Sequence, residues 1–332
     1  MVKIIVLLFM KIKQNKNLLF DKTVKVDFKF IVKLLLYYPV SLFYKLWLCL
    51  FSKKDNRKCK HLISVCAIFK NEANFLIEWL EYHIMLGVDH FYLYNNNSTD
   101  NFNEILEKYI NSGIVTLIDW PYIPGQLSAY KHWNDNYREE SNWITFIDID
   151  EFICPKYKMN LKEWISGYKK YPVIVMYWQF FCSSGKLEHD YSKPVIEQYF
   201  TCCEKPYNIG KIIYNTRFEV VPFNIGMWHS TSCRVKGVVV PPINVQKKFL
   251  MWNIHFLRNS NIDLLLNHYW SKSYRTLLEK KGKGAAAFQE TYITDDWFWR
   301  NDASCIKSEF TIYRFLLPLK LRLINKNDTM SV

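Results

Sequence analysis

Three carboxylates stand close together near the middle of the chain, where a run of apolar residues ends. Asp148, Asp150 and Glu151 follow the apolar residues of the segment WITFIDIDEFICP. Side chains two positions apart in a regular strand point to the same side, so Asp148 and Asp150 would share one side. Two such carboxylates suit a hard divalent cation, Mg²⁺ or Mn²⁺, whose other ligands are water and substrate phosphate. A solvated strand end is the alternative, because a D-x-D pair alone is a weak motif.

The elements that position these carboxylates are expected to alternate between strands and helices. Apolar runs predict strands over 62–69, 90–95, 114–120 and 143–150, and helical spacing predicts helices over 71–87, 101–113 and 126–140. This rhythm indicates an α/β fold with a mostly parallel sheet flanked by helices. Ligands of such sheets bind beyond the carboxyl ends of the strands, where the loops KNE, NNNSTD and DIDE follow. The three polar motifs should therefore converge on one edge.

The second half of the chain has a less regular pattern, and we expect it to complete the same domain. Strands are predicted within 171–185 and 211–223. The segment 261–284 is predicted to be helical, ending in basic residues and a glycine.

Composition narrows the classes of partner. Half of the 332 residues are hydrophobic and 17% are aromatic, which excludes wholesale disorder. A formal charge of +13 favours a negatively charged partner, such as nucleic acid, anionic lipid or a phosphorylated small molecule. Nucleic acid is not expected, because the sequence contains no zinc-finger spacing, RNP-like segment or arginine-rich stripe.

The nine cysteines include no C-x-x-C pair, which argues against a structural zinc site. A disulfide framework is not indicated in a chain of this length. We expect buried, reduced thiols in a cytosolic compartment.

Residues 1–57 form a hydrophobic, basic leader. Its segment 34–51, LLLYYPVSLFYKLWLCLF, is long enough to cross a membrane, but Pro39, Lys45 and several aromatic residues weaken that prediction. We expect it to lie in the membrane interface, on the cytoplasmic face, with a single-pass anchor as the alternative. The C-terminal segment 291–332 has a similar basic and amphipathic character.

Several segments resemble glycosyltransferase family 92 and related family 2-like enzymes of the GT-A fold. They occur in the family's order and read ISVCAIFKNEANFLIEWLEYHIMLGVDHFYLYNNNSTD, QLSAYKHW, WITFIDIDEFICP and LNHYWSKSYRTLLEKKGKG. The resemblance runs from about residue 62 to about residue 285 and implies a GT-A domain over 58–290.

The resemblance implies a nucleotide-sugar donor, with a UDP-sugar favoured, and transfer of the sugar to a hydroxyl of a glycan or lipid-linked acceptor. It implies Mn²⁺ or Mg²⁺ bound by Asp148, Asp150 and His268. The residues implied to bind the donor are Lys70, Asn71, Glu72, Asn95, Asn96, Asp100, Gln126, Lys272 and Lys280.

The family is regarded as inverting, and inversion needs a base that takes the acceptor's proton. Candidates are Glu188, His189 and Asp190 in the loop CSSGKLEHDY, and Glu151 beside the D-x-D pair. Related sequences have glycine where Cys182 stands, so the geometry of this loop is open.

Two other classes compete with a transferase. A sugar-phosphate nucleotidyltransferase needs a glycine-rich loop around the triphosphate, and VCAIFKNEA contains no glycine. A non-catalytic sugar- or lipid-binding protein of the same fold is the remaining alternative. Such proteins usually lose the metal-binding acids or the C-terminal histidine, and both are present here.

Overall fold

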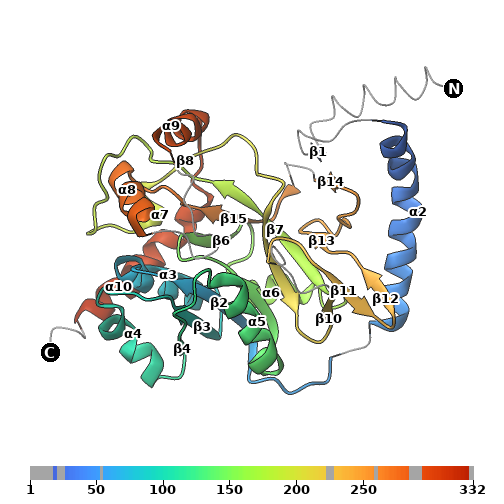
Figure 1. Ribbon diagram of the computed structural model, residues 1–332, viewed down its shortest axis with the longest axis horizontal. Helices are drawn as coiled ribbons and strands as arrows, with labels where there is room; N and C mark the ends of the chain where they lie inside the picture. The colour runs from blue at the N-terminus through green and yellow to red at the C-terminus, as the bar shows by residue number, and fades with distance from the viewer. Residues whose placement is uncertain are drawn as a thin grey trace.

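A nine-stranded sheet flanked by helices forms the centre of the protein (Figure 1). The computed structural model describes residues 18–20, 27–52, 55–221, 228–257, 261–283 and 294–328. The main path of the sheet runs in the order β4-β3-β2-β5-β9-β7-β15-β6, and β13 pairs with β7.

The first half of the sheet is parallel and matches the prediction. The strands are β2 (His61–Phe69), β3 (His90–Asn95), β4 (Val115–Asp119) and β5 (Ser141–Phe146). The helices between them are α3 (Ala73–Met85), α4 (Phe102–Asn111) and α5 (Gln126–Asn136). β2 and β3 are apolar on both faces because both faces are covered. The α/β architecture with a mostly parallel sheet, expected for a GT-A fold, is confirmed.

The second half of the sheet is mixed. β9 (Gly210–Asn215) runs antiparallel between β5 and β7 (Val173–Phe180). β15 (Leu264–His268) is parallel to β7, and β6 (Glu151–Pro155) closes the edge antiparallel to β15. The short strand β13 (Ile243–Asn244) is parallel to β7.

The remaining helices and small sheets surround this sheet. The helices are α2 (Phe28–Phe51), α6 (Leu161–Ser166), α7 (Val195–Gln198), α8 (Tyr274–Lys283), α9 (Asp295–Ser304) and α10 (Leu316–Asp328), with 3-10 turns η1 (Arg138–Glu140) and η3 (Thr311–Phe315). The small sheets are β1 (Leu18–Phe20) with β14 (Ile254–Phe256), β10 (Glu219–Val221) with β11 (Ser232–Val235) and β12 (Val238–Val240), and β8 (Thr201–Cys202) with β16 (Lys307–Ser308).

Two predictions about secondary structure were wrong. The segment 261–284 is not one helix, since Leu264–His268 is strand β15 and α8 begins only at Tyr274. Its short apolar run pairs with β7 and β6, and periodicity alone cannot separate such a run from a buried helix. The strand predicted over 143–150 ends at Phe146, so Asp148 and Asp150 lie in the turn before β6 and strand alternation does not apply to them.

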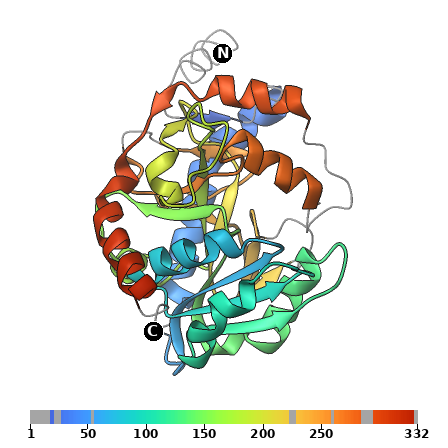
Figure 2. The same cartoon turned by 90° about the vertical axis from the view of Figure 1, so that its left-hand side faces the viewer.

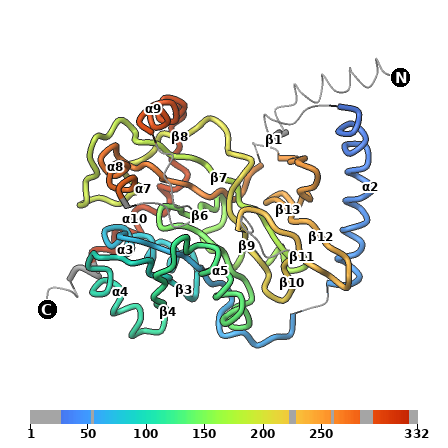
Figure 3. The backbone as a smooth tube through the Cα atoms, in the orientation of Figure 1, coloured from blue at the N-terminus to red at the C-terminus, as the bar shows by residue number. Residues whose placement is uncertain are grey.

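The two terminal segments pack at opposite ends of the molecule (Figures 1 and 3). α2 lies at one end and is the one described helix that is long and apolar enough to cross a membrane. α10, red in Figure 2, lies beside α3, where Arg322 Nε donates a 2.8 Å hydrogen bond to Glu81 Oε2. The predicted leader within 1–17 and 21–26, and Lys53 and Lys54, lie outside the described residues.

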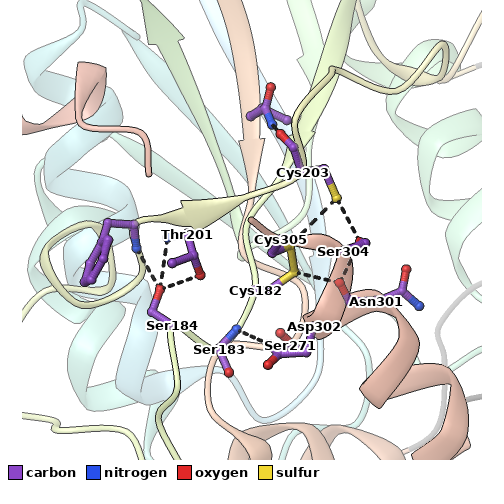
Figure 4. Close-up of a disulfide and its surroundings, with 12 residues drawn as sticks. Cys182, Ser183, Ser184, Thr201, Cys203, Ser271, Asn301, Asp302, Ser304 and Cys305 are labelled. Atoms are coloured by element: carbon purple, nitrogen blue, oxygen red, sulfur yellow. Dashed lines mark hydrogen bonds between the residues drawn. A yellow bond between two sulfur atoms is a disulfide. The ribbon is translucent and has the colours of Figure 1, made fainter. Parts of the chain in front are cut away.

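The prediction that all nine thiols are reduced was also wrong. Cys182, after β7, forms a disulfide with Cys305, at the end of α9 (Figure 4). The two cysteines are 123 residues apart, and only the tertiary fold brings them together. Beside them Asp302 Oδ1 accepts a 2.9 Å hydrogen bond from the Ser183 amide.

Gly210 allows β9 to approach β7, and this gives a prediction about stability. A Cβ atom at Gly210 would lie 1.7 Å from the Met176 carbonyl oxygen, so Gly210→Ala must push the two strands apart. We expect the free energy of unfolding to fall by about 1–3 kcal/mol or more, measured by denaturant unfolding. Gly282→Ala is the control, because an added Cβ would meet no atom within 4 Å outside the adjacent backbone of its own helix, and alanine is a better helix former. Equal unfolding midpoints for both variants would contradict this account of β9.

Candidate active site

Six charged or titratable side chains meet at the turn between β5 and β6. The three carboxylates of this turn, Asp148, Asp150 and Glu151, face two lysines and one histidine, which come from three later elements. These partners are Lys211 on β9, Lys280 on α8 and His268 at the end of β15. We call this group the charged cluster.

Lys211 is almost completely buried and lies between two of the carboxylates. Its Nζ is 2.9 Å from Asp148 Oδ2 and 3.9 Å from Glu151 Oε1. Burial works against a charged lysine, but Asp148 and Glu151 outweigh it and raise the pKa of Lys211. Lys211 was not among the predicted site residues. The available signal was a single lysine inside the apolar strand segment GKIIYN.

Asp150 is also buried, and its two oxygens have different neighbours. Oδ2 lies 2.5 Å from Lys280 Nζ, and Oδ1 lies 3.4 Å from His268 Nε2. Burial opposes ionisation of Asp150, but Lys280 and His268 outweigh it and hold its pKa well below the ordinary value. Burial lowers the pKa of His268. Asp150 is therefore a buried anion held chiefly by the ammonium group of Lys280.

Glu151 has no exposed surface, and hydrogen bonds to its side chain and backbone fix it in place. Its Oε1 accepts from Trp178 Nε1 at 2.7 Å, and its Oε2 accepts from the Asp148 amide at 3.0 Å. Trp79 Nε1 of α3 donates to the Glu151 carbonyl at 2.9 Å. Burial raises the pKa of Glu151 well above its ordinary value. These contacts shape the turn that carries Asp148 and Asp150.

The predicted donor-binding loops after β2 and β3 are fastened to each other. Asn71, with a φ of 53°, accepts a 2.7 Å hydrogen bond on Oδ1 from the Thr99 amide. Its own amide donates to Ser98 Oγ at 3.0 Å, and Asp100 Oδ2 accepts from the Ala73 amide at 2.8 Å. The structure thus brings Asn71 and Asp100 together as ties between the two loops.

Asn95 and Asn96 make similar ties to the last residue of β4 and to the segment after it. Asn96 is buried, and its Nδ2 donates to the carbonyls of Trp120 and Tyr122 at 2.7 and 2.9 Å. Asn95 Nδ2 donates to Asp119 Oδ1 at 2.9 Å. These side chains hold the edge of the site in shape.

The remaining predicted donor-binding residues lie closer to the charged cluster. Gln126, the first residue of α5, donates from Nε2 to Asp148 Oδ1 at 3.3 Å. Glu72 is the N-cap of α3, and its charge helps to raise the pKa of Lys280. Lys272 is buried with Nζ 4.1 Å from the Phe75 ring centroid, and its charge helps to lower the pKa of Asp150. Lys70 is half-buried at the end of β2.

The loop that carries the predicted bases lies against the start of α8. The Leu187 carbonyl accepts a 3.0 Å hydrogen bond from the Arg275 amide. Glu188 is exposed and pairs with Arg275, 3.0 Å away. Hydrogen bonds from Ser192 lower the pKa of Asp190 to about 2, and burial lowers the pKa of His189 to about 4.

Glu78 of α3 anchors the far end of this loop. Its buried carboxylate accepts hydrogen bonds from the amides of Val195 and Ile196 at 2.7 and 3.2 Å. Burial nevertheless raises the pKa of Glu78 to about 7. Ionisation of Glu78 near neutral pH therefore costs folding free energy.

The geometry fits a divalent cation only if the cation is held by few protein ligands. Among the described residues, no three His, Cys, Asp or Glu side chains come together as a metal site. Asp150 Oδ1 and His268 Nε2 are 3.4 Å apart, longer than an ordinary N–H···O hydrogen bond. Two adjacent ligands about 2.1 Å from one ion lie about 3 Å apart, so this pair fits one edge of its coordination shell. Asp148, the third predicted ligand, accepts hydrogen bonds from Lys211 and Gln126 in this structure.

The raised pKa of Glu78 predicts a pH-dependent loss of stability. A carboxyl group whose pKa is 4.5 unfolded and about 7 folded favours folding less as the pH rises from 4.5 through 7. Relative to Glu78→Gln, the wild-type protein should lose about 3 kcal/mol of unfolding free energy over that range. Urea unfolding at several pH values measures the difference. Glu104→Gln, which replaces an exposed glutamate, is the control and should show no such pH dependence. A difference between Glu78→Gln and wild type that does not change with pH would contradict the prediction.

Comparison with known proteins agrees with the resemblance in sequence. The pattern of glycosyltransferase family 92 matches residues 60–282. A family 92 protein of Oryza sativa subsp. japonica is 35% identical over 122 residues, 36% of this chain and 21% of its own length. One from Arabidopsis thaliana is 33% identical over 132 residues, 37% of this chain and 23% of its own length. The matched stretches thus cover about a fifth of these curated relatives.

Solved structures show more distant likeness. S. aureus TarS 1-349 in complex with UDP has a TM-score of 0.32 and 16% identity, over 47% of each chain. The mannosyltransferase PcManGT from Pyrobaculum calidifontis, in complex with GDP-Man and Mn²⁺, has a TM-score of 0.29 and 14% identity, over 44% of this chain and 45% of its own. Scores this low carry no argument about function. The match over residues 60–282, two thirds of the sequence, is sufficient by itself: the chain belongs to glycosyltransferase family 92.

Proposed function

We propose that this protein is a glycosyltransferase that moves a sugar from a nucleoside-diphosphate sugar, with UDP favoured, to a hydroxyl acceptor. The observation that carries the proposal is the charged cluster, within the part of the chain that matches the family. Asp150, His268 and Lys280 meet there at the carboxyl edge of the sheet, where ligands of α/β folds bind.

Asp150 and His268 would hold a divalent cation, Mn²⁺ or Mg²⁺. The pair supplies one carboxylate oxygen and one imidazole nitrogen, and such ions usually take further ligands from water and substrate phosphate. When bound, the cation would neutralise charge on the donor's diphosphate. Asp148 lies beside this pair, where its carboxylate keeps Lys211 charged and accepts a hydrogen bond from Gln126.

Lysines of the cluster supply fixed positive charge for the departing diphosphate. Lys280 Nζ binds Asp150 Oδ2 and the Trp270 carbonyl, which leaves one of its three N–H groups for a phosphate oxygen. The buried charge of Lys272 acts on the same region. Charges that are already in place cost no reorganisation when negative charge develops on the leaving group.

The loop over 186–191 is the proposed acceptor side, with inversion at the sugar carbon. Glu188 and Asp190 stay the predicted proton acceptors, although a pKa of about 2 makes Asp190 a weak base. Glu151 is completely buried and would act by positioning the turn.

A lipid-linked or membrane-bound glycan acceptor is part of the proposal, supported by the apolar helix α2. The predicted cytoplasmic face rested on reduced thiols and on the lack of a signal cleavage site, and the Cys182–Cys305 disulfide removes the first of these supports.

Nucleotide binding by charged-cluster variants tests the donor and the metal together. Wild-type protein should gain thermal stability with one nucleoside diphosphate only when Mn²⁺ is present, in a panel of UDP, GDP and CDP. Asp150→Asn and His268→Ala should lose that shift, because each variant removes one of the two proposed ligands of the cation. Asp148→Asn should keep part of it, because Asp148 contacts Lys211 instead.

Asp135→Asn, an exposed carboxylate on α5, is the matched control and should respond like wild type. Turnover of the nucleotide sugar identified by this panel then separates a transferase from a non-catalytic binding protein. Asp150→Asn should lower kcat/KM by roughly 10²–10³. A cooperatively melting protein with no metal-dependent shift for any nucleotide would overturn the proposal.

A further inference from the structure

The outer side of α2 is an unusually apolar surface. Leu35, Leu42, Leu46 and Leu50 are 69%, 58%, 56% and 71% exposed, and they lie on the side of the helix that faces away from the protein. Together with exposed Phe28 and Phe43 they form a continuous strip, which we call the apolar face. A strip of this kind on a folded protein marks a membrane or protein contact.

The inner side of α2 is fixed to the protein along its length. The buried or half-buried residues recur every three or four positions and form one stripe: Phe30, Leu34, Tyr37, Ser41, Tyr44 and Leu48. Tyr37 OH donates to the Phe249 carbonyl at 2.8 Å, and Trp47 Nε1 donates to the Val235 carbonyl at 2.9 Å. A helix held in this way cannot cross a bilayer unless the strands beside it enter the bilayer as well.

Positive charges border the apolar face. Successive residues of a helix are turned by about 100°, so positions around α2 can be counted from the buried Tyr37. On this count, Lys29 and Lys33 lie on one side of the buried stripe, and Lys45 lies on the other side. Phe28–Phe51 contains no Asp or Glu. Lysines at both borders of an apolar strip are typical of helices that lie in the plane of an anionic membrane surface.

A cleft between α2 and the residues before β14 adds a second site for negative charge. It has a volume of about 230 Å³ and is lined by Tyr37, Tyr38, Ser41, Lys45, Lys247 and Lys248, among others. Three lysines line it, and no acidic side chain of the described residues does. Leu42 of the apolar face also lines this α2 cleft, so the cleft adjoins the apolar face.

We infer that α2 lies flat on an anionic bilayer, with the apolar face among the acyl chains and a headgroup phosphate in the α2 cleft. The inference deepens the proposed membrane association and is independent of the transfer chemistry. α10 lies at the opposite end of the molecule, so one flat bilayer that contacts α2 does not contact α10 (Figure 1).

Vesicle flotation of the full chain, without any nucleotide, tests the contact. Wild-type protein should bind phosphatidylcholine vesicles containing phosphatidylglycerol more tightly than phosphatidylcholine alone. Leu42→Glu/Leu46→Glu should weaken binding to both kinds of vesicle by tenfold or more, because the burial of one leucine side chain among acyl chains raises affinity by about tenfold or more. Lys45→Glu/Lys247→Glu should remove the preference for phosphatidylglycerol, since each basic residue near such a surface raises the affinity roughly fivefold.

Two controls match these variants. Leu317→Glu replaces an exposed leucine of α10, and Lys131→Glu/Lys205→Glu reverses two exposed charges that lie outside α2 and its cleft. Both should bind vesicles like wild type. Binding lost equally in the controls, or retained in Leu42→Glu/Leu46→Glu, would overturn the inference. So would a wild-type dimer that Leu42→Glu/Leu46→Glu dissociates, because a second copy would then cover the apolar face.

The orientation of the helix has a test of its own. An environment-sensitive fluorophore is placed on cysteine at position 35, 42 or 50, with exposed Cys49 replaced by serine. A helix in the membrane plane puts all three probes at the same depth. A spanning helix separates positions 35 and 50 by about 22 Å, at about 1.5 Å per residue, and that result would overturn the in-plane arrangement.

Discussion

The buried ammonium group of Lys211 is the interaction on which the arrangement of the site depends. Its burial is tolerable because the half-buried carboxylate of Asp148 lies 2.9 Å away and the buried Glu151 lies 3.9 Å away. Lys211 sits on β9, the strand at which the parallel half of the sheet meets the mixed half. The β5–β6 turn and the pairing of β9 with β7 are therefore coupled through one buried charge.

The elements that could be predicted from the sequence are those whose structure is determined by a local residue pattern. The parallel half was predicted well, because each of its strands and helices has a clear period and a turn at its end. β15 was not, because a short apolar run becomes a strand only through its neighbours. Lys211 and the Cys182–Cys305 disulfide depend on contacts 63 and 123 residues apart along the chain, which no local pattern records. Asp150 and His268 were predicted through the resemblance and do meet.

The polar loops at the sheet edge show why residue type alone overstates a binding site. Strand ends leave backbone groups that need partners, and short polar side chains provide them. Asn96 donates hydrogen bonds to two backbone carbonyls, and Asp100 accepts one from a backbone amide of the neighbouring loop. The same residues that make NNNSTD look like a ligand-binding loop are those that give the loop its shape.

The segment that follows β7 is fixed to the rest of the protein at both of its ends. The disulfide and Asp302 hold its beginning, and Glu78 holds Val195 and Ile196 at its end. Fixing two ends of a chain segment removes much of its conformational entropy before any ligand arrives. A molecule that docks on this segment meets a surface that is already ordered, so less of its interaction energy is lost to ordering the protein.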